Sequence, residues 1–278
     1  MPVNHGTFLA HVLDTDDDIS EVQAALGLEA IDRWGVYDTS ADASAETPDE
    51  CVNRQFREFI ATLNGWPKTI AISTAARAAL KKCVRDFLRK SADTKLVEYM
   101  DKEYSLYKLV ERQLCGPEIG RPFASIDDFV KTASSIMNRR KSRAGWSLEN
   151  HVADLLTEAG IPFSARSADI DGEPDIVIPN IQAYKDPSYP VDKLCIVGVK
   201  TTCRDRWRQV LKEGPRIPRK HILTMQRGIS AKQLNEMHAA NVTLIVPAAL
   251  HKDYPKVPGI KLVQVSEFLD WASALAKG

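Results

Sequence analysis

The sequence contains no long apolar run: none approaches the roughly 18 to 20 residues that a membrane-spanning helix needs. The first twenty residues contain no Lys or Arg and include four aspartates, Asp14 and Asp16 to Asp18. A secretory signal peptide begins with a positively charged segment, so this start does not resemble one. We therefore expect no membrane partner and no secretion.

Cysteine is scarce as well. The chain of 278 residues has five, and no two of them form a Cys-x-x-Cys pair. This wide spacing favours neither a zinc site nor a disulfide framework. We expect free thiols and a location in the reducing cytoplasm. The cysteines are Cys51, Cys83, Cys115, Cys195 and Cys203.

The net charge is zero, but acidic and basic residues are unevenly distributed along the chain. The first 50 positions hold twelve acidic residues and one basic residue, Arg33, so the rest of the chain carries a net charge of +11. A basic body indicates a polyanionic partner such as nucleic acid. A merely solvated acidic segment explains the same pattern, and charge alone does not decide between the two.

Three regions follow from the pattern of apolar and polar residues. Residues 1–47 form an acidic arm, and residues 48–138 are expected to be mainly helical, starting at the capping sequence Thr47-Pro48. A helix in this region should end at Cys115-Gly116-Pro117. Residues 139–278 alternate strands and helices, which predicts an α/β domain with a mixed sheet flanked by helices. We expect helices at about 48–64, 73–90, 92–114, 125–137, 148–159, 205–213, 230–240 and 266–277, and strands at 162–166, 174–178, 194–200, 222–225, 242–246 and 260–264.

Two short apolar runs, at 174–178 and 194–200, predict neighbouring buried strands. Asp175 lies at the start of the first run and Lys200 at the end of the second. Charge is costly to bury, so its presence at both strand ends suggests a function. A carboxylate beside a lysine is suited to holding a divalent cation against a phosphate. Two solvated strand ends are the alternative interpretation of such a pair.

The segment that follows Lys200 is too basic for an ordinary amphipathic helix. Arg204, Arg206 and Arg208 are accompanied by a single acid, Asp205. Guanidinium groups commonly read guanine edges and bind phosphates. The segment is therefore expected to contact DNA.

A second basic cluster, Arg139, Arg140 and Arg143, contains no acid. It fits a solvated face and phosphate binding equally well, and we predict phosphate contacts. Glu149 follows beside an apolar helical stripe. It is either an ordinary surface acid or an acid that reaches a site beneath the helix.

Pro174-Asp175 and Lys200, with 24 residues between the aspartate and the lysine, resemble the PD-(D/E)xK nuclease core. The acid expected two residues before the lysine is replaced by Gly198. One group of type II restriction endonucleases, which read CCGG, CCNGG or CCWGG cores, lacks the same acid and takes it from the following helix. The EcoRII catalytic domain, PspGI and NgoMIV are of this type. Arg204-Asp205-Arg206 and Glu213 resemble the reading motif and the replacement acid of that group, and the resemblance covers about 140–265.

The resemblance implies a PD-(D/E)xK restriction-endonuclease-like fold and Mg²⁺-dependent double-strand cleavage at a palindromic site containing CC/GG, leaving 5′-phosphates. Asp175 and Glu213 would hold Mg²⁺, with Glu149 as a further ligand. Lys200 would orient or help to deprotonate the attacking water. Glu173 is a rival ligand, but alternation along a strand should point it to the opposite face.

The resemblance also implies the partners. Arg204 and Arg206 would donate to guanine and Asp205 would accept from cytosine, whereas Arg208 would contact phosphate or solvent. One such module covers half of a palindrome, so double-stranded DNA would be bound by a homodimer. A cognate DNA methyltransferase is the implied functional partner. Two alternatives remain: a structure-specific repair or junction nuclease on the same core, and a catalytically inactive DNA-binding protein.

Overall fold

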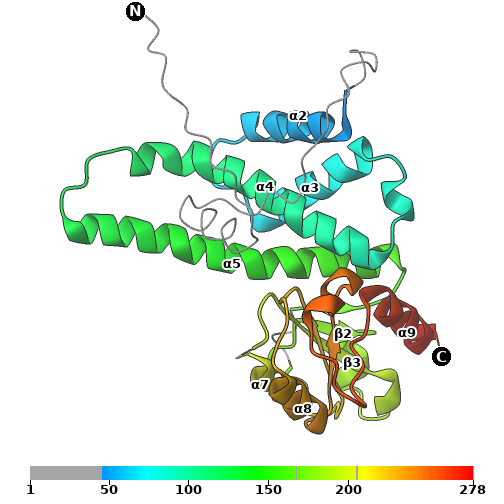
Figure 1. The fold of residues 1–278 in the computed structure, drawn as a ribbon. Coiled ribbons are helices and arrows are strands. Elements are labelled where there is room, and N and C mark those ends of the chain that lie inside the picture. The colour runs from blue at the N-terminus through cyan, green and yellow to red at the C-terminus, as the bar shows by residue number, and fades with distance from the viewer. Residues whose placement is uncertain (1–45, 167, 169, 205, 278) are drawn as a thin grey trace, which may run out of the picture. The chain divides into compact units, whose positions relative to one another are not determined.

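The computed structural model describes residues 46–166, 168, 170–204 and 206–277 (Figure 1). The acidic arm therefore lies almost entirely outside the described residues, as does Asp205 of the expected reading motif. The helices are α2 (Pro48–Ala61), α3 (Thr69–Cys83), α4 (Ala92–Ile119), α5 (Ile126–Glu158), α6 (Ile181–Lys185), α7 (Trp207–Val210), α8 (Ala231–Ala239) and α9 (Val265–Lys277), with short 3₁₀ helices η1 (Phe87–Arg89), η2 (Val191–Lys193) and η3 (Ala248–Asp253). The strands are β1 (Ser164–Ala165), β2 (Ile176–Ile178), β3 (Cys195–Lys200), β4 (Lys220–Thr224) and β5 (Val242–Ile245).

The first half of the described chain is helical, as the sequence predicts. Thr47 caps α2 by accepting from the backbone N–H of Glu50, whose carboxylate accepts from the N–H of Thr47 in return. The apolar faces of α2, α3 and α4 share one core, which includes Phe56, Ile72 and Tyr107. Burial of these large side chains is the main source of stability in such a helical layer.

The expectation of free thiols throughout is wrong, because Cys51 and Cys83 form a disulfide. The bond links the first turn of α2 to the end of α3. These two cysteines are separated by 32 residues in the sequence and meet only because α2 packs against α3. The other cysteines, Cys115, Cys195 and Cys203, are free and buried.

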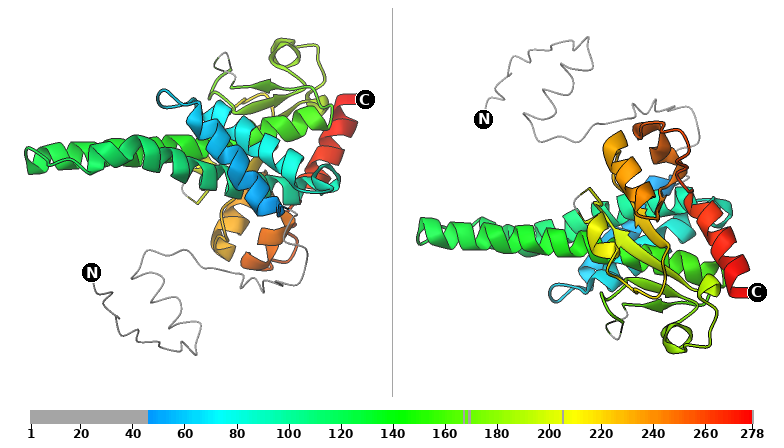
Figure 2. Two further views of the ribbon diagram at one scale, coloured as in Figure 1. Left: turned by 90° about the horizontal axis from the view of Figure 1, so that it is seen from above. Right: turned by 90° about the horizontal axis from the view of Figure 1, so that it is seen from below.

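Helices α4 and α5 are longer than expected and lie side by side (Figures 1 and 2). Helix α4 continues through Gly116-Pro117 to Ile119, since a proline this close to a helix end removes only one internal hydrogen bond. Helix α5 begins at the expected cap, Ser125, but runs without a break to Glu158. The boundary expected between 138 and 139 therefore falls inside a helix.

A five-stranded mixed sheet occupies the second half, in the order β1-β2-β3-β4-β5. The β1–β2 and β2–β3 pairs are antiparallel, whereas the β3–β4 and β4–β5 pairs are parallel. Helices cover both faces (Figure 1). One core joins the sheet to α4, α5 and α9, and the other joins it to α7 and α8. The predicted mixed sheet flanked by helices is confirmed.

Several elements are shorter than the sequence suggests, β1 and β2 among them, and two others are reduced further. The helix expected at 205–213 is reduced to the four residues of α7, and the turn that follows contains Glu213. The strand expected at 260–264 is reduced to one bridge between Val263 and Ile245. Among the described residues, no helix combines the length and apolarity required to span a membrane.

Candidate active site

The pairing of β2 with β3 brings Asp175 and Lys200 together. The strands are antiparallel with Ile176 opposite Val197, so the start of β2 lies beside the end of β3. Lys200 Nζ donates to Asp175 Oδ2 at 2.7 Å, and the backbone N–H of Val199 donates to the same oxygen at 2.6 Å. The predicted adjacency of the two charged strand ends is confirmed.

Glu213 joins this pair from the turn after α7. Its side chain is buried, with Oε1 3.5 Å from Lys200 Nζ. A Cβ atom at position 198 would lie 3.5 Å from Glu213 Oε2. The carboxylate of Glu213 therefore lies beside the place from which a side chain at 198 would project. The structure thus places a carboxylate beside Gly198, where the local sequence supplies none.

The turn that contains Glu213 is fixed by contacts that the sequence analysis missed. The buried Lys220 Nζ donates to the carbonyl oxygens of Glu213 at 2.6 Å and Gly214 at 2.8 Å. Gly172, at φ +81°, packs so closely that an added Cβ would lie 2.7 Å from Glu213 Cα. Only glycine combines this close approach with a left-handed backbone. Lys220 could have been noticed in the sequence because it is a charged residue at the start of an apolar strand, β4.

Glu149 approaches the same place from α5. It lines a pocket of about 300 Å³ together with Glu173, Asp175, Arg166, Trp146 and Ala168. Arg166 Nε donates to Glu149 Oε2 at 2.9 Å. The sequence analysis did not single out Arg166 either. Its position directly after β1, the strand that pairs with β2, could have indicated that it lies near Asp175.

Contrary to expectation, side-chain alternation along β2 does not point Glu173 away from Asp175. Glu173 precedes β2 in a turn, at φ +49°, so the alternation of side chains along a strand does not apply to it. It is exposed and lines the same pocket as Asp175. Asp175 is nevertheless the acid that contacts Lys200.

Burial and neighbouring charges shift the pKa values of this group in different directions. Burial raises the pKa of Glu213 to about 7, although the positive charge of Lys200 opposes the shift. Burial also raises the pKa of Glu149, against the hydrogen bond from Arg166. For Lys200, burial lowers the pKa, but Asp175 and Glu213 outweigh burial and raise it. Lys200 is therefore a charged hydrogen-bond donor in this arrangement.

The acids suit a hard divalent cation in their chemistry. In the part of the chain that the structure describes, no three His, Cys, Asp or Glu side chains are grouped closely enough to hold a metal ion. Lys200 instead bridges Asp175 and Glu213. Carboxylate oxygens are the ligands that Mg²⁺ prefers, and Glu213 Oε2 is buried without a hydrogen-bond partner among the described residues. A buried, unpartnered carboxylate oxygen fits a cation ligand.

The segment after β3 presents two arginines to solvent. Arg204 and Arg206 are exposed. The backbone N–H of Arg204 donates to Gln226 Oε1 at 3.0 Å, which ties the segment to the end of β4. Arg208 is paired with Glu236 of α8 at 2.6 Å. Arg204 and Arg206 therefore remain available to a ligand, whereas Arg208 already has a partner.

The cluster on α5 is engaged mostly within the helical layer. Arg139 lies over the Trp66 ring at 4.0 Å, and the exposed Arg140 pairs with Glu111 at 2.6 Å. Arg143 is buried, and its nearest carboxylate, on Glu103 of α4, is 3.2 Å away. Of the three arginines, Arg143 is thus the one that faces the protein interior.

The chain is also similar in sequence to known proteins. Residues 107–269 match the family described as the EcoRII C-terminal domain. The chain belongs to this family. It is 41% identical to the type II restriction enzyme EcoRII of Escherichia coli over 179 residues, which cover 64% of this chain and 44% of EcoRII. It is also 24% identical to the type II restriction enzyme SsoII of Shigella sonnei over 221 residues, covering 72% of this chain and 68% of SsoII.

Solved structures share the fold of this EcoRII C-terminal family member. Metal-depleted Ecl18kI in complex with uncleaved, modified DNA matches with a TM-score of 0.63 and 19% identity, covering 81% of this chain and 84% of Ecl18kI. The PspGI–substrate DNA complex matches with a TM-score of 0.61 and 18% identity, covering 76% of this chain and 93% of PspGI. The expected restriction-endonuclease fold and the EcoRII-type resemblance are both confirmed.

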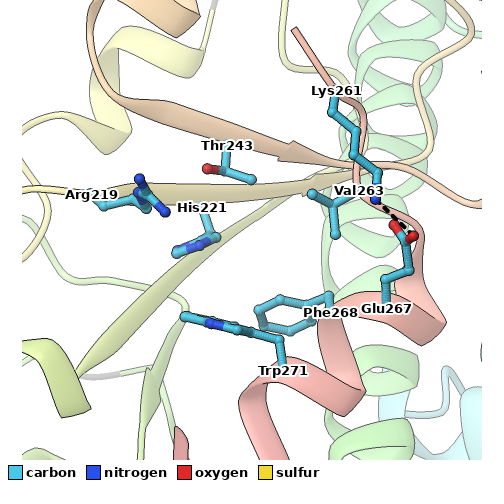
Figure 3. A pocket seen from close by; sticks show the side chains of 8 residues that line it. All are labelled: Arg219, His221, Thr243, Lys261, Val263, Glu267, Phe268 and Trp271. Carbon is cyan, nitrogen blue, oxygen red and sulfur yellow. Dashed lines mark hydrogen bonds and ion pairs between the residues drawn. The ribbon is translucent and has the colours of Figure 1, made fainter. Parts of the chain in front are cut away.

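This family member has another pocket, of about 310 Å³, at the opposite end of the parallel strands (Figure 3). It lies beside the starts of β4 and β5, whereas Lys200 ends β3. His221 packs against the Trp271 ring at 5.0 Å, and Lys261 pairs with Glu267 at 2.9 Å. Its lining includes the rings of His221, Phe268 and Trp271 and a single acid, Glu267, which is paired with Lys261, so its size alone does not make it a candidate for phosphoryl chemistry.

Proposed function

We propose that this chain is a type II restriction endonuclease that cuts both strands of DNA at a palindromic site containing CC/GG and leaves 5′-phosphates. The observation that carries the proposal is the convergence of Asp175, Lys200 and Glu213, with Glu213 beside Gly198. The chain spans only about 44% of the length of EcoRII. The activity is therefore proposed on this geometry together with family membership.

Asp175 and Glu213 would hold Mg²⁺, with Glu149 as a further ligand. The bound ion would neutralise charge on the scissile phosphate and lower the pKa of a ligated water. Lys200, which donates to Asp175 in the structure, would donate to the attacking water or to a phosphate oxygen. Either contact would align the water and the phosphate for in-line attack. The buried position of Glu213 strengthens these electrostatic contacts, since water screens them less there.

Sequence reading is assigned to the segment after β3. Arg204 and Arg206 would each donate a bidentate pair to a guanine edge, and Asp205 would accept from cytosine N4. The exposure of both arginines supports this role, and their backbone is anchored through Gln226. One such segment covers one half-site, so we propose a twofold-symmetric homodimer on DNA and a cognate methyltransferase that protects the same site.

Phosphate contacts are proposed for the basic residues around this segment. Arg208, Arg139 and Arg140 would bind backbone phosphates, with Arg208 and Arg140 exchanging Glu236 and Glu111 for DNA. Arg143 is assigned to packing of α5 against α4, because it is buried.

Digestion of a defined plasmid with Mg²⁺, followed by sequencing of the ends, tests the proposal. We expect breaks in both strands at one palindromic sequence containing CC/GG, with 5′-phosphates, and no cutting by the Asp175→Asn variant. Cutting at junctions or flaps without sequence preference would favour the repair-nuclease alternative. Specific binding of DNA without cutting would favour the inactive DNA-binding protein.

A further inference from the structure

Trp146 and Arg166 form a wall between two pockets. On one side lies the acidic pocket that contains Asp175, Glu149 and Glu173. On the other side lies a second pocket, of about 310 Å³. This second pocket is lined by Lys68, Thr69, Ile70, Trp146, Asn150 and Arg166.

The wall is fixed from several directions. Arg166 lies over the Trp146 ring at 3.8 Å and donates through Nη2 to Asn150 Oδ1 at 3.2 Å. Its backbone N–H donates to the carbonyl oxygen of Asp175 at 2.8 Å. Its φ of +53° is unusual for a residue with a side chain. Such a conformation persists only where the surroundings impose it, and it is concentrated at functional sites.

The two pockets have opposite charge. Three carboxylates line the acidic pocket. Within the described part of the chain, no acidic residue lines the second pocket, whereas Lys68 and Arg166 do. Lys68 is exposed and forms no ion pair with any described carboxylate, and the Arg166 side chain is 46% exposed. A pocket for a cation and a pocket for an anion thus share one wall.

We propose that the second pocket binds the DNA backbone phosphate next to the scissile phosphate, with Lys68 and Arg166 as donors and Trp146 as the support of Arg166. The inference rests on the proposed function, since the acidic pocket must receive the scissile phosphate. Successive phosphates lie close together along a strand. A strand with one phosphate at Asp175 therefore carries its neighbour past Trp146 and Arg166. The contact is to the backbone and adds affinity and register without reading bases.

Lys68→Ala is the decisive variant, because Lys68 contacts none of the proposed metal ligands. Binding is measured over a range of salt concentrations with Ca²⁺ in place of Mg²⁺, on cognate and random duplexes. We expect about tenfold weaker binding to both duplexes, as for one lost charge-assisted contact. The slope of log affinity against log salt should become shallower by about 0.9. Lys277→Ala, which removes an exposed lysine at the end of α9, is the matched control and should change neither quantity.

Duplexes with one neutral methylphosphonate locate the contact. Wild-type protein should lose affinity when the phosphate next to the scissile one is replaced. Lys68→Ala should lose less affinity on the same replacement, because only Arg166 remains to contact that phosphate. Lys68→Gln, which keeps most of the side-chain length, should behave like Lys68→Ala.

Full additivity of the methylphosphonate and Lys68→Ala at every phosphate would overturn the subsite. Wild-type affinity of Lys68→Ala for both duplexes would overturn it as well. Either result leaves the proposed function standing if wild-type protein still cuts at one sequence. Failure of wild-type protein to bind or cut DNA at all would instead refute the proposed function.

Discussion

Replacement of Gly198 by alanine tests the arrangement that brings Glu213 into the site. The new Cβ would lie 2.7 Å from Val210 Cγ2 and 3.3 Å from Val210 Cγ1, but at an ordinary 3.5 Å from Glu213 Oε2. The clash therefore pushes on α7, three residues before Glu213. Overpacking of this kind typically lowers the free energy of unfolding by about 1–3 kcal/mol, whereas replacing a glycine within a strand raises it by about 0.5–1 kcal/mol. We expect a net loss of stability of up to about 2.5 kcal/mol, and slower cleavage because Glu213 is displaced.

Urea unfolding and single-turnover cleavage measure the two consequences. Val210→Ala removes both clashing atoms, so Gly198→Ala/Val210→Ala should be more active and more stable than the sum of the single variants predicts. If Gly198→Ala unfolds at the wild-type urea concentration and cleaves at the wild-type rate, the packing of Gly198 against α7 is refuted. An additive double variant would show that Val210 does not transmit the effect.

Three further outcomes follow. Arg206→Ala should cost about 1–3 kcal/mol of discrimination and relax one G·C position in a cleavage screen of altered sites, and equal losses on cognate and random DNA would contradict the reading role. Burial raises the pKa of Asp93, but hydrogen bonds from the Ser266 hydroxyl and three backbone N–H groups outweigh burial and lower it. Because a lowered pKa stabilises the fold above the unfolded-state pKa, the stability gap between wild type and Asp93→Asn should be full near neutral pH and shrink as pH falls through the acid range; a pH-independent gap in urea unfolding would contradict this. Sedimentation with cognate duplex and Ca²⁺ should give two chains per duplex, and one chain that cuts both strands in a single binding event would exclude the dimer.

The sequence is informative where apolar runs and charge coincide. Asp175 and Lys200 could be placed together because two short apolar strands end in charged residues. Glu213 was named only through the family resemblance, because the residues before it form a short helix and a turn without a period of their own. Lys220 and Arg166 lie at strand ends, which was a signal, but their contacts with Glu213 and Glu149 depend on where turns bring the backbone, which local sequence does not encode.

The helical half shows the same limit. The apolar pattern suggested a boundary between 138 and 139, yet α5 runs through it as one continuous helix. The pairs of Arg140 with Glu111 and of Arg143 with Glu103 hold this helix against α4. The Cys51–Cys83 disulfide likewise depends on the packing of α2 against α3 rather than on spacing. Tertiary contacts decided these features, and they overrode the local signals.

The role of Glu213 as an acid of the site is tested most directly by the single-turnover cleavage rate of Glu213→Gln with Mg²⁺, compared with the rates of Asp175→Asn and wild type. We predict that Glu213→Gln loses cleavage as completely as Asp175→Asn, while both still bind the cognate duplex in Ca²⁺. Cleavage by Glu213→Gln at a rate near that of wild type would contradict this prediction, and would make Glu149 or Glu173 the second acid of the site.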